Sequence, residues 1–426
     1  MRAALARLFY ATGEGNRLTP GGGVDLVLKA AAVALSIYIG WYAFYGVTNE
    51  HLHGAVFLLV MLPVIFLTTT VSRAVHRITP LDYALAAASV AVCVYYIAND
   101  SFYRTLIEGV TPIPEHEIFV GIVTVLLSIE ACRRSVGWGL TSVLLILLAY
   151  VFFGHFLSGE LHHDPIRIDY FVQLQTVLSV DGIFGTPLEV AATYAFLFVL
   201  FGSFYQRAGG GVFFFELATA LCGRAVGGPA KACVVSSALY GSISGSPTAD
   251  VVTTGPITIP LMTRTGISAK RAAAIEAAAS SGGALLPPVM GTVAFLMVGF
   301  TGLAYEAIVK AGALVAILYY FGVFMAVHAE AKRSGQGQIE ESQLVGLVAA
   351  LRRGWRQMLP IVALLYFLVE GYTPTYVAAG ATLFVVILSW LNTEADFRIG
   401  PRAFVEACME TVTRMSALTG AVLAAG

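Results

Sequence analysis

The sequence predicts an all-α, polytopic integral membrane protein. Of its 426 residues, 58% are hydrophobic and only 12% are charged, which is about half the charged fraction of an average soluble domain. Several apolar stretches approach the roughly 20 residues that a helix needs to cross a bilayer. The formal net charge is −1, so no basic field favours a nucleic acid. We therefore expect a lipid bilayer as the environment and no nucleic acid partner.

The first six apolar stretches alternate between basic and acidic flanks, and Lys and Arg gather on the cytoplasmic side of membrane helices. Basic residues stand before the first stretch and after every second one: Arg2, Arg7, Arg17, Arg73, Arg77, Arg133, Arg134 and Arg207. Acidic or uncharged loops follow the other stretches. The alternation predicts a cytoplasmic N-terminus and six crossings, at residues 24–47, 55–71, 83–98, 118–132, 138–157 and 188–205.

A segment rich in Gly, Ser and Pro, GSISGSPTAD at 241–250, then interrupts the apolar pattern. Lys231 precedes it and Arg264 follows it, so both ends of this region are basic. The apolar legs, 232–240 and 251–262, have only about 9 to 12 residues, too few to cross the membrane. We expect a re-entrant hairpin over 230–264 with an irregular tip at 241–250. Bare backbone groups at membrane depth usually serve an ion or a polar solute.

The polar side chains of this tip have two readings. Ser242, Ser244 and Ser246 either ligate an ion or solute, or merely cap the helix ends. Asp250 begins the outgoing leg, where a carboxylate either caps the first turn or helps to organise an ion site. Both readings stay open at this point.

A second interruption follows the hairpin. The helix expected at 272–279 meets Ser280, Ser281 and Gly282, and then Pro287 and Pro288. Proline removes a backbone hydrogen bond and clashes with the preceding turn, so we expect a broken helix. Its free ends would offer donors to anions and oxygen ligands to Na⁺.

Glu276 stands four residues before Ser280, so the two side chains share a helix face. An intramembrane carboxylate is a functional candidate. Glu276 also stands only five residues after Arg271, so a solvated or paired residue at the membrane interface is the alternative.

The sequence carries no sign of an enzyme. GSISG differs from the G-x-S-x-G motif because Ile243 occupies the central position, and no phosphate-binding G-x-x-x-x-G-K-[ST] motif is present. The five cysteines lack metal-site spacing, so we read them as buried apolar residues. We therefore predict neither catalysis nor a bound cofactor.

Taken together, GSISGSPTADVVTTGPITIPLM and the later SSGGALLPPVM resemble the large membrane subunit of tripartite ATP-independent periplasmic (TRAP) transporters. The resemblance covers about 188–426. By position, Ser244, Gly245, Ser246 and Asp250 match the family's hairpin tip, and Pro287–Pro288 its proline pair. Pro247 stands where small or hydroxyl residues are common, and GGALLPPV differs from the more usual G-P-I-I-P-P-S.

The resemblance implies an elevator-type secondary transporter in a prokaryotic inner membrane. A periplasmic binding protein would deliver a carboxylate-bearing solute, such as a C4-dicarboxylate, and Na⁺ or H⁺ would drive uptake by symport. Na⁺ would be held at Ser244, Gly245 and Ser246. The wider ion and substrate site would comprise Ser242, Ser244, Gly245, Ser246, Asp250, Thr253, Ser280, Ser281, Gly282, Pro287 and Pro288.

The same resemblance divides the chain into three regions. Residues 1–136 resemble a fused small subunit with four helices, a fusion typical of the branch served by TAXI-type binding proteins. Residues 137–345 correspond to the first half of the large subunit, and 346–426 to the start of an inverted second half that is incomplete here. A stand-alone ion-coupled dicarboxylate carrier or antiporter is the first alternative. A membrane enzyme or non-transporting assembly subunit is the second.

Overall fold

The computed structural model describes residues 16–46, 49–72, 75–106, 111, 113–177, 182–334, 346–392 and 394–426, and every regular element in these ranges is helical. Arg2, Arg7 and Arg73 of the topology prediction lie outside the described residues. The chain forms two compact units: unit 1 comprises Met1–Phe196 and Cys408–Gly426, and unit 2 comprises Leu197–Ala407. These units do not coincide with the divisions expected at 136 and 345, so the small-subunit and repeat boundaries stay a prediction.

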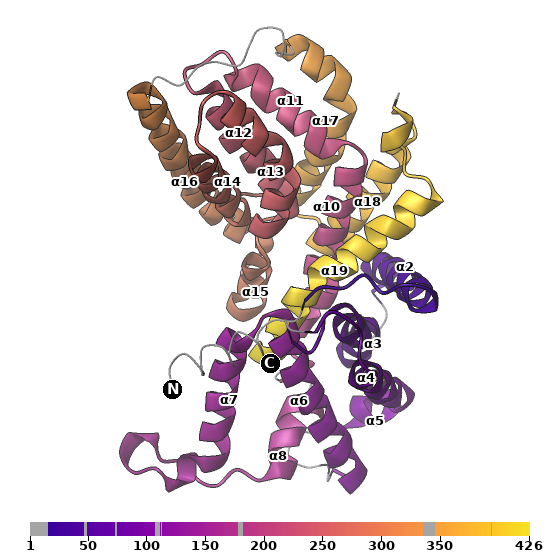
Figure 1. The fold of residues 1–426 in the computed structure, drawn as a ribbon. Helices are drawn as coiled ribbons and strands as arrows, with labels where there is room; N and C mark the ends of the chain where they lie inside the picture. Colours follow the sequence, from indigo (N-terminus) through magenta and orange to yellow (C-terminus); the bar gives the residue numbers. More distant parts are fainter. Residues whose placement is uncertain are drawn as a thin grey trace. The chain divides into compact units, whose positions relative to one another are not determined.

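Unit 1 contains the first five apolar stretches and the start of the sixth, together with short helices between them (Figure 1). Its helices are α2 (Gly23–Tyr45), α3 (Glu50–Thr68), α4 (Pro80–Ala98), α5 (Asp100–Thr105), α6 (Glu115–Ser135), α7 (Trp138–Phe153), α8 (Ile168–Val172) and α9 (Thr186–Val190). A π-helical turn, Ala191–Ala195, joins α9 to α10 (Phe196–Arg207). The C-terminal part of α19 (Pro401–Ala425) completes the unit.

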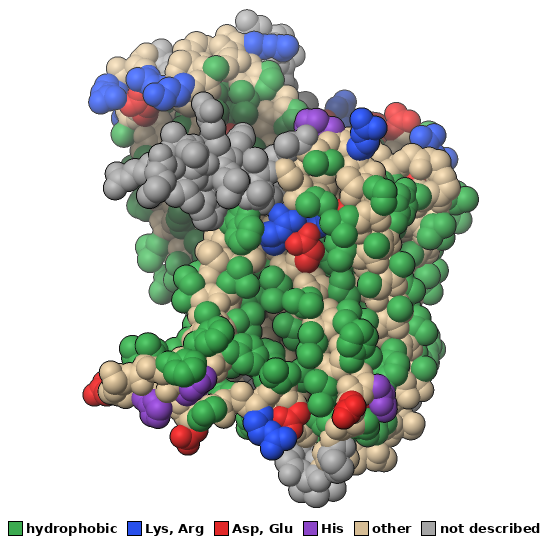
Figure 2. All heavy atoms as spheres, turned by 60° about the horizontal axis from the view of Figure 1, so that its bottom comes forward, with side chains coloured by type: hydrophobic (Ala, Val, Ile, Leu, Met, Phe, Trp, Pro, Cys, Tyr) green, Lys and Arg blue, Asp and Glu red, His purple; other side chains and the backbone are tan. Residues whose placement is uncertain are grey.

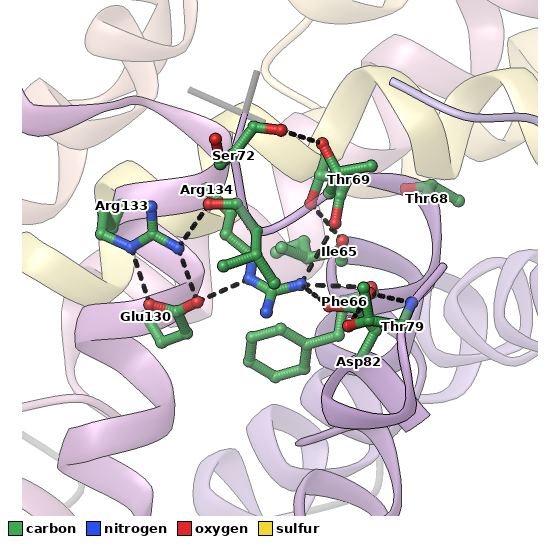
Figure 3. Close-up of polar contacts among 12 residues, drawn as sticks. Ile65, Phe66, Thr68, Thr69, Ser72, Thr79, Asp82, Glu130, Arg133 and Arg134 are labelled. Carbon is green, nitrogen blue, oxygen red and sulfur yellow. Dashed lines mark hydrogen bonds and ion pairs between the residues drawn. The ribbon is translucent and has the colours of Figure 1, made fainter. Parts of the chain in front are cut away.

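A buried ion cluster fixes α4 to α6 within unit 1. Figure 3 shows Arg134 between Glu130 and Asp82, and both ion-pair distances are 2.6 Å. The other carboxylate oxygen of Asp82 accepts hydrogen bonds from the Thr79 backbone N–H and hydroxyl, at 2.6 and 2.8 Å. The side chains of Arg134 and Asp82 are 0% and 1% exposed. Arg134, one of the residues that predict the basic cytoplasmic flank, therefore has a structural role, because its charge is neutralised by buried partners inside the fold.

Unit 2 contains the hairpin and the broken helix. Its helices after α10 are α11 (Gly210–Cys222), α12 (Gly228–Ser244), α13 (Pro247–Arg264), α14 (Ala269–Ser281), α15 (Thr292–Thr301), α16 (Tyr305–Ser334), α17 (Leu347–Val369) and α18 (Pro374–Ser389). Helices α12, α13 and α14 lie side by side (Figure 1) around a core that includes Ala230, Cys233, Met262, Ala272 and Ala279. The candidate residues of the sequence therefore lie in one compact unit.

The irregular hairpin tip is much shorter than the sequence predicts. The legs α12 and α13 contain 17 and 18 residues, so the expected short legs and the irregular stretch at 241–250 were wrong. Only 245–246 separates the helices, because Gly245 takes φ 59° as the C-cap, Ser246 is the N-cap and Pro247 occupies the first turn. Gly after a helix and Pro at its start are the residues that favour such a tight junction.

The surface of the chain has the composition expected for contact with lipid. Among the described residues, six helices are long and apolar enough to cross a bilayer: Gly23–Tyr45, Glu50–Thr68, Pro80–Ala98, Trp138–Phe156, Thr186–Arg207 and Tyr305–Ser334. Five of the six expected early crossings fall on these helices, and 118–132 lies within α6. Apolar side chains are spread widely over the face drawn in Figure 2. Each hairpin leg is about 25 Å long, shorter than the ~30 Å hydrocarbon core, so re-entry stays a prediction.

Candidate functional site

The hairpin tip encloses a carboxylate. The Ser244 hydroxyl donates to Asp250 Oδ1, and the Ser246 N–H donates to the Ser244 hydroxyl oxygen at 3.2 Å. Asp250 lies in the first turn of α13 and is 0% exposed. A negative charge is favourable there because the first turn presents unsatisfied N–H groups and the positive end of the helix dipole. The tip thus holds one buried carboxylate that is bonded to the Ser244 hydroxyl.

Two glycines bring the hairpin and the broken helix into backbone contact. A Cβ atom on Gly241 would lie 2.7 Å from Asp250 Oδ2 and closer still to the Gly283 Cα. A Cβ atom on Gly283 would clash with Asp250 Oδ2 and the Gly241 Cα in turn. Only glycine fits at both positions, because any side chain would push the backbones apart. The broken helix therefore passes directly beside the Asp250 carboxylate.

The extended stretch after the break is bonded to the tip. Helix α14 ends at Ser281, and a 3₁₀ turn, Gly282–Leu285, leads to the cis peptide Pro287–Pro288. The Val289 N–H then donates to the Ser242 carbonyl at 3.0 Å. The Tyr305 hydroxyl donates to the Pro288 and Val289 carbonyls at 2.6 and 2.9 Å. The interruption expected from the sequence is confirmed, and the structure places its proline pair against the hairpin.

A second buried carboxylate belongs to Glu276 of α14, which is also 0% exposed. It accepts hydrogen bonds from the Thr254 and Thr258 hydroxyls, from the Ser280 hydroxyl at 3.2 Å and from the Cys233 thiol at 3.0 Å. These four neutral donors come from α12, α13 and α14. We call this arrangement the Glu276 cage. This burial contradicts the reading of Glu276 as a solvated residue at the membrane interface, and its functional role stays a prediction.

The other predicted residues divide between the tip and its surroundings. Ser280 belongs to the Glu276 cage, whereas the exposed Ser281 donates to the Ala277 carbonyl at 2.7 Å. The Ser242 hydroxyl donates to the Leu239 carbonyl at 2.8 Å. The Ser246 hydroxyl accepts from the Ala249 N–H at 3.4 Å and so caps α13. For Ser246 the structure shows the capping role, and its carbonyl accepts the first hydrogen bond of the helix from the Asp250 N–H at 3.0 Å.

The Thr253 hydroxyl is bonded to the side chains of Gln206 and Tyr240. Its oxygen accepts from Gln206 Nε2 at 3.1 Å, and the Tyr240 hydroxyl donates to Gln206 Oε1 at 2.7 Å. These contacts tie α10 to both legs of the hairpin. Gly282 packs against aromatic rings, since a Cβ there would lie 2.6 Å from Tyr319 Cε1. Sequence reasoning did not select Thr254 and Thr258, which donate to Glu276 from the neighbouring helix α13. Their i, i+4 spacing places them on one helix face, but it does not indicate that this face meets Glu276.

An all-helical, multi-pass membrane protein whose hairpin and broken helix share buried carboxylates has the general form of a membrane solute carrier. Residues 123–426 match the family model described as the tripartite ATP-independent periplasmic transporter, DctM component. The match covers more than half of the chain, and the chain therefore belongs to this family of TRAP transporter permeases. The family resemblance inferred from the hairpin motif is thus confirmed.

Individual relatives agree with this assignment. The chain is 25% identical over 301 residues to the C4-dicarboxylate TRAP transporter large permease protein DctM of Rhodobacter capsulatus. The aligned region covers 65% of this chain and 68% of that relative. It is 27% identical over 259 residues to the isethionate TRAP transporter permease protein DctMQ of Oleidesulfovibrio alaskensis, covering 56% and 39%. A Pseudomonas aeruginosa DctM is 26% identical over 229 residues, covering 53% of each chain.

Proposed function

We propose that this chain is the permease component of a binding-protein-dependent secondary transporter that imports a carboxylate-bearing solute. A C4-dicarboxylate is the favoured substrate class, since two of the relatives carry that name. The transporter would lie in a prokaryotic inner membrane with its N-terminus in the cytoplasm. Its partner would be a periplasmic binding protein. If residues 1–136 are a fused small subunit, that binding protein would be of the TAXI type, because such fusions are typical of the TAXI branch.

The observation that carries this proposal is the pair of buried carboxylates at the hairpin and the break. Asp250 and Glu276 are both 0% exposed, and ionised carboxylates are costly to bury without a compensating charge. The four partners of Glu276 are neutral, so hydrogen bonds disperse its charge without cancelling it. A bound cation or proton would neutralise the site, which is the property that ion coupling requires.

The two carboxylates suit different coupling ions. Asp250, the Ser244 hydroxyl and the carbonyls at Gly245 and Ser246 are hard oxygen ligands of the kind that bind Na⁺. The Glu276 cage can instead hold a proton, because a protonated carboxyl remains hydrogen-bonded among hydroxyl groups. We propose Na⁺ at the tip, with H⁺ at Glu276 as the alternative coupling ion. An elevator motion of the unit that carries hairpin and broken helix would then move ion and solute together.

The test is uptake of a labelled C4-dicarboxylate by the purified protein in proteoliposomes, under an imposed Na⁺ or pH gradient. Uptake is expected only when a cognate binding protein is present. Asp250→Asn should abolish the response to Na⁺, and Glu276→Gln the response to a pH gradient, because each removes the ionisable group and keeps its volume. Glu306→Gln, at a half-exposed site paired with Lys310, is the control.

Two outcomes would overturn this proposal. Full gradient-driven uptake without any binding protein would favour the stand-alone carrier. No uptake under either gradient, with a binding protein that binds the substrate, would favour a non-transporting subunit.

A further inference from the structure

Unit 1 contains a polar cavity that the transport proposal does not use. The cavity volume is 640 Å³. It lies among the segment before α2, the C-terminal ends of α3 and α6, and the second half of α19. Its walls carry hydroxyl and basic side chains beside a few apolar ones; the lining residues that matter here are Arg17, Lys29, Thr68, Thr69, Thr413 and Ser416.

Backbone pairing places Arg17 at this cavity. Residues around Arg17 form an antiparallel bridge with Thr69 at the end of α3. The Leu18 N–H donates to the Thr68 carbonyl at 2.7 Å, and the Thr70 N–H donates to the Asn16 carbonyl at 3.0 Å. Because these bonds use backbone atoms only, the position of Arg17 does not depend on its own side chain.

Among the described residues, three basic side chains line the cavity: Arg17, Lys29 and Arg134. Lys29 and Arg134 already have ion-pair partners. Lys29 pairs with Asp25 at 2.6 Å, and Asp25 is the one acidic residue among the described residues that line the cavity. Arg134 is committed to Asp82 and Glu130 (Figure 3). Within the described part of the chain, the guanidinium of Arg17 has no ion-pair or side-chain hydrogen-bond partner, and its side chain is exposed. The cavity therefore offers a guanidinium and several hydroxyl groups to one anion.

Helix α2, which forms one wall, has an apolar outer surface next to the cavity. Leu26 and Val27 are 71% and 66% exposed and immediately follow Asp25. An amphiphilic ligand can place its anionic group in the cavity and its hydrocarbon along this surface. Basic pockets between membrane helices on the cytoplasmic side are known to suit anionic lipid headgroups. The proposed cytoplasmic N-terminus would put this cavity in that leaflet.

We propose that the cavity binds the phosphate group of an anionic phospholipid, with Arg17 as its main charged contact. The hydroxyl groups of Thr413 and Ser416 now donate to carbonyls of their own helix and can turn toward a phosphate oxygen. The site is independent of the two carboxylates in unit 2, so it stands or falls separately from the transport proposal.

The experiment is native mass spectrometry of the purified protein in non-ionic detergent. Phosphatidylglycerol, phosphatidylcholine and inorganic phosphate are added in separate arms. Phosphatidylglycerol is expected to remain bound, and Arg17→Gln to weaken it about fivefold, as one arginine near an anionic headgroup is worth ~1 kcal/mol. Arg77→Gln is the matched control, since Arg77 is an exposed arginine of unit 1 outside the cavity.

Equal weakening by Arg17→Gln and Arg77→Gln would overturn the site, as would equal retention of phosphatidylcholine. If inorganic phosphate at the same concentration displaces phosphatidylglycerol, the cavity binds free phosphate rather than a lipid headgroup, and the lipid proposal is wrong. Thermal unfolding of both variants in detergent without lipid is expected to match that of the unmodified protein.

Discussion

Gly241 and Gly283 allow the backbones of the hairpin and the broken helix to touch beside a buried carboxylate. Asp250 Oδ2 would lie 2.7 Å from a Cβ placed on Gly241. This contact makes the two interruptions of the helical pattern one structural unit. Several expected outcomes follow from that arrangement and from the buried charges elsewhere in the chain.

Gly283→Ala is expected to destabilise the protein by about 1–3 kcal/mol, because the added methyl group overpacks a backbone contact. The measurement is thermal unfolding in detergent. Gly322→Ala is the control, since its Cβ would meet nothing within 4 Å inside α16 and alanine favours helix. If both substitutions lower the melting temperature equally, the close contact is not what holds the hairpin to the break.

Glu276→Ala is expected to cost about 2–4 kcal/mol in stability, because it leaves a cavity and removes the acceptor for four donors. Glu306→Ala removes a carboxylate that is 37% exposed and paired with Lys310, so its effect should stay below ~1 kcal/mol. Thermal unfolding compares the two. Similar shifts would show that the Glu276 cage contributes no more than a surface ion pair.

Ser244→Ala tests whether the tip binds Na⁺. The hydroxyl donates to Asp250 and would orient that carboxylate toward the ion, so its loss should raise the Na⁺ concentration for half-maximal uptake about tenfold. The matched substitution is Ser142→Ala in α7, because that hydroxyl donates to the Gly139 carbonyl of its own helix at 3.0 Å and lies outside the predicted site. An unchanged Na⁺ dependence in Ser244→Ala would remove the tip from the ion site.

Asp82→Asn is expected to destabilise unit 1 by up to about 3 kcal/mol, because the buried Arg134 would lose one of its two carboxylate partners and keep only Glu130. Arg167→Gln, at an ion pair whose side chains are 81% and 39% exposed, should have almost no effect. Thermal unfolding in detergent provides the comparison. Equal effects would mean that Arg134 reaches water despite its burial.

The loop after α7 should loosen as the pH rises. Hydrogen bonds to the Tyr150 and Asp164 carbonyls raise the pKa of His163 above its usual 6.5. Because the folded pKa is the higher one, the stabilising contribution is complete below pH 6.5 and is lost as the pH passes the raised pKa. Hydrogen exchange of 154–164 should increase over that range. His163→Gln should abolish the pH dependence; if it persists, another group is responsible.

The sequence predicted the hairpin and the break but not their detail. Proline pairs and glycine clusters interrupt helices for local reasons, so their positions can be read from the chain. The length of the tip was misjudged because Ser and Gly within 241–244 were read as irregular, whereas they continue α12 up to the cap at Gly245.

The partners of buried charges could not be read in the same way. Asp82 and Arg134 are 52 residues apart, and nothing local indicates their pairing. Thr253 was favoured over Thr254, although neighbouring residues on a helix point about 100° apart, and only packing decides which of them faces Glu276.

Each threonine of the Glu276 cage has a single hydroxyl hydrogen and two oxygens within reach. Thr254 can donate to Glu276 or to the Asp250 carbonyl, and Thr258 to Glu276 or to the Thr254 carbonyl. When the carboxylate is neutralised, these hydrogens can swing to the main chain and stay bonded. Loading and unloading would then require only rotation about side-chain bonds, which is fast on the scale of domain motion. Any slow step of a transport cycle must arise outside the cage.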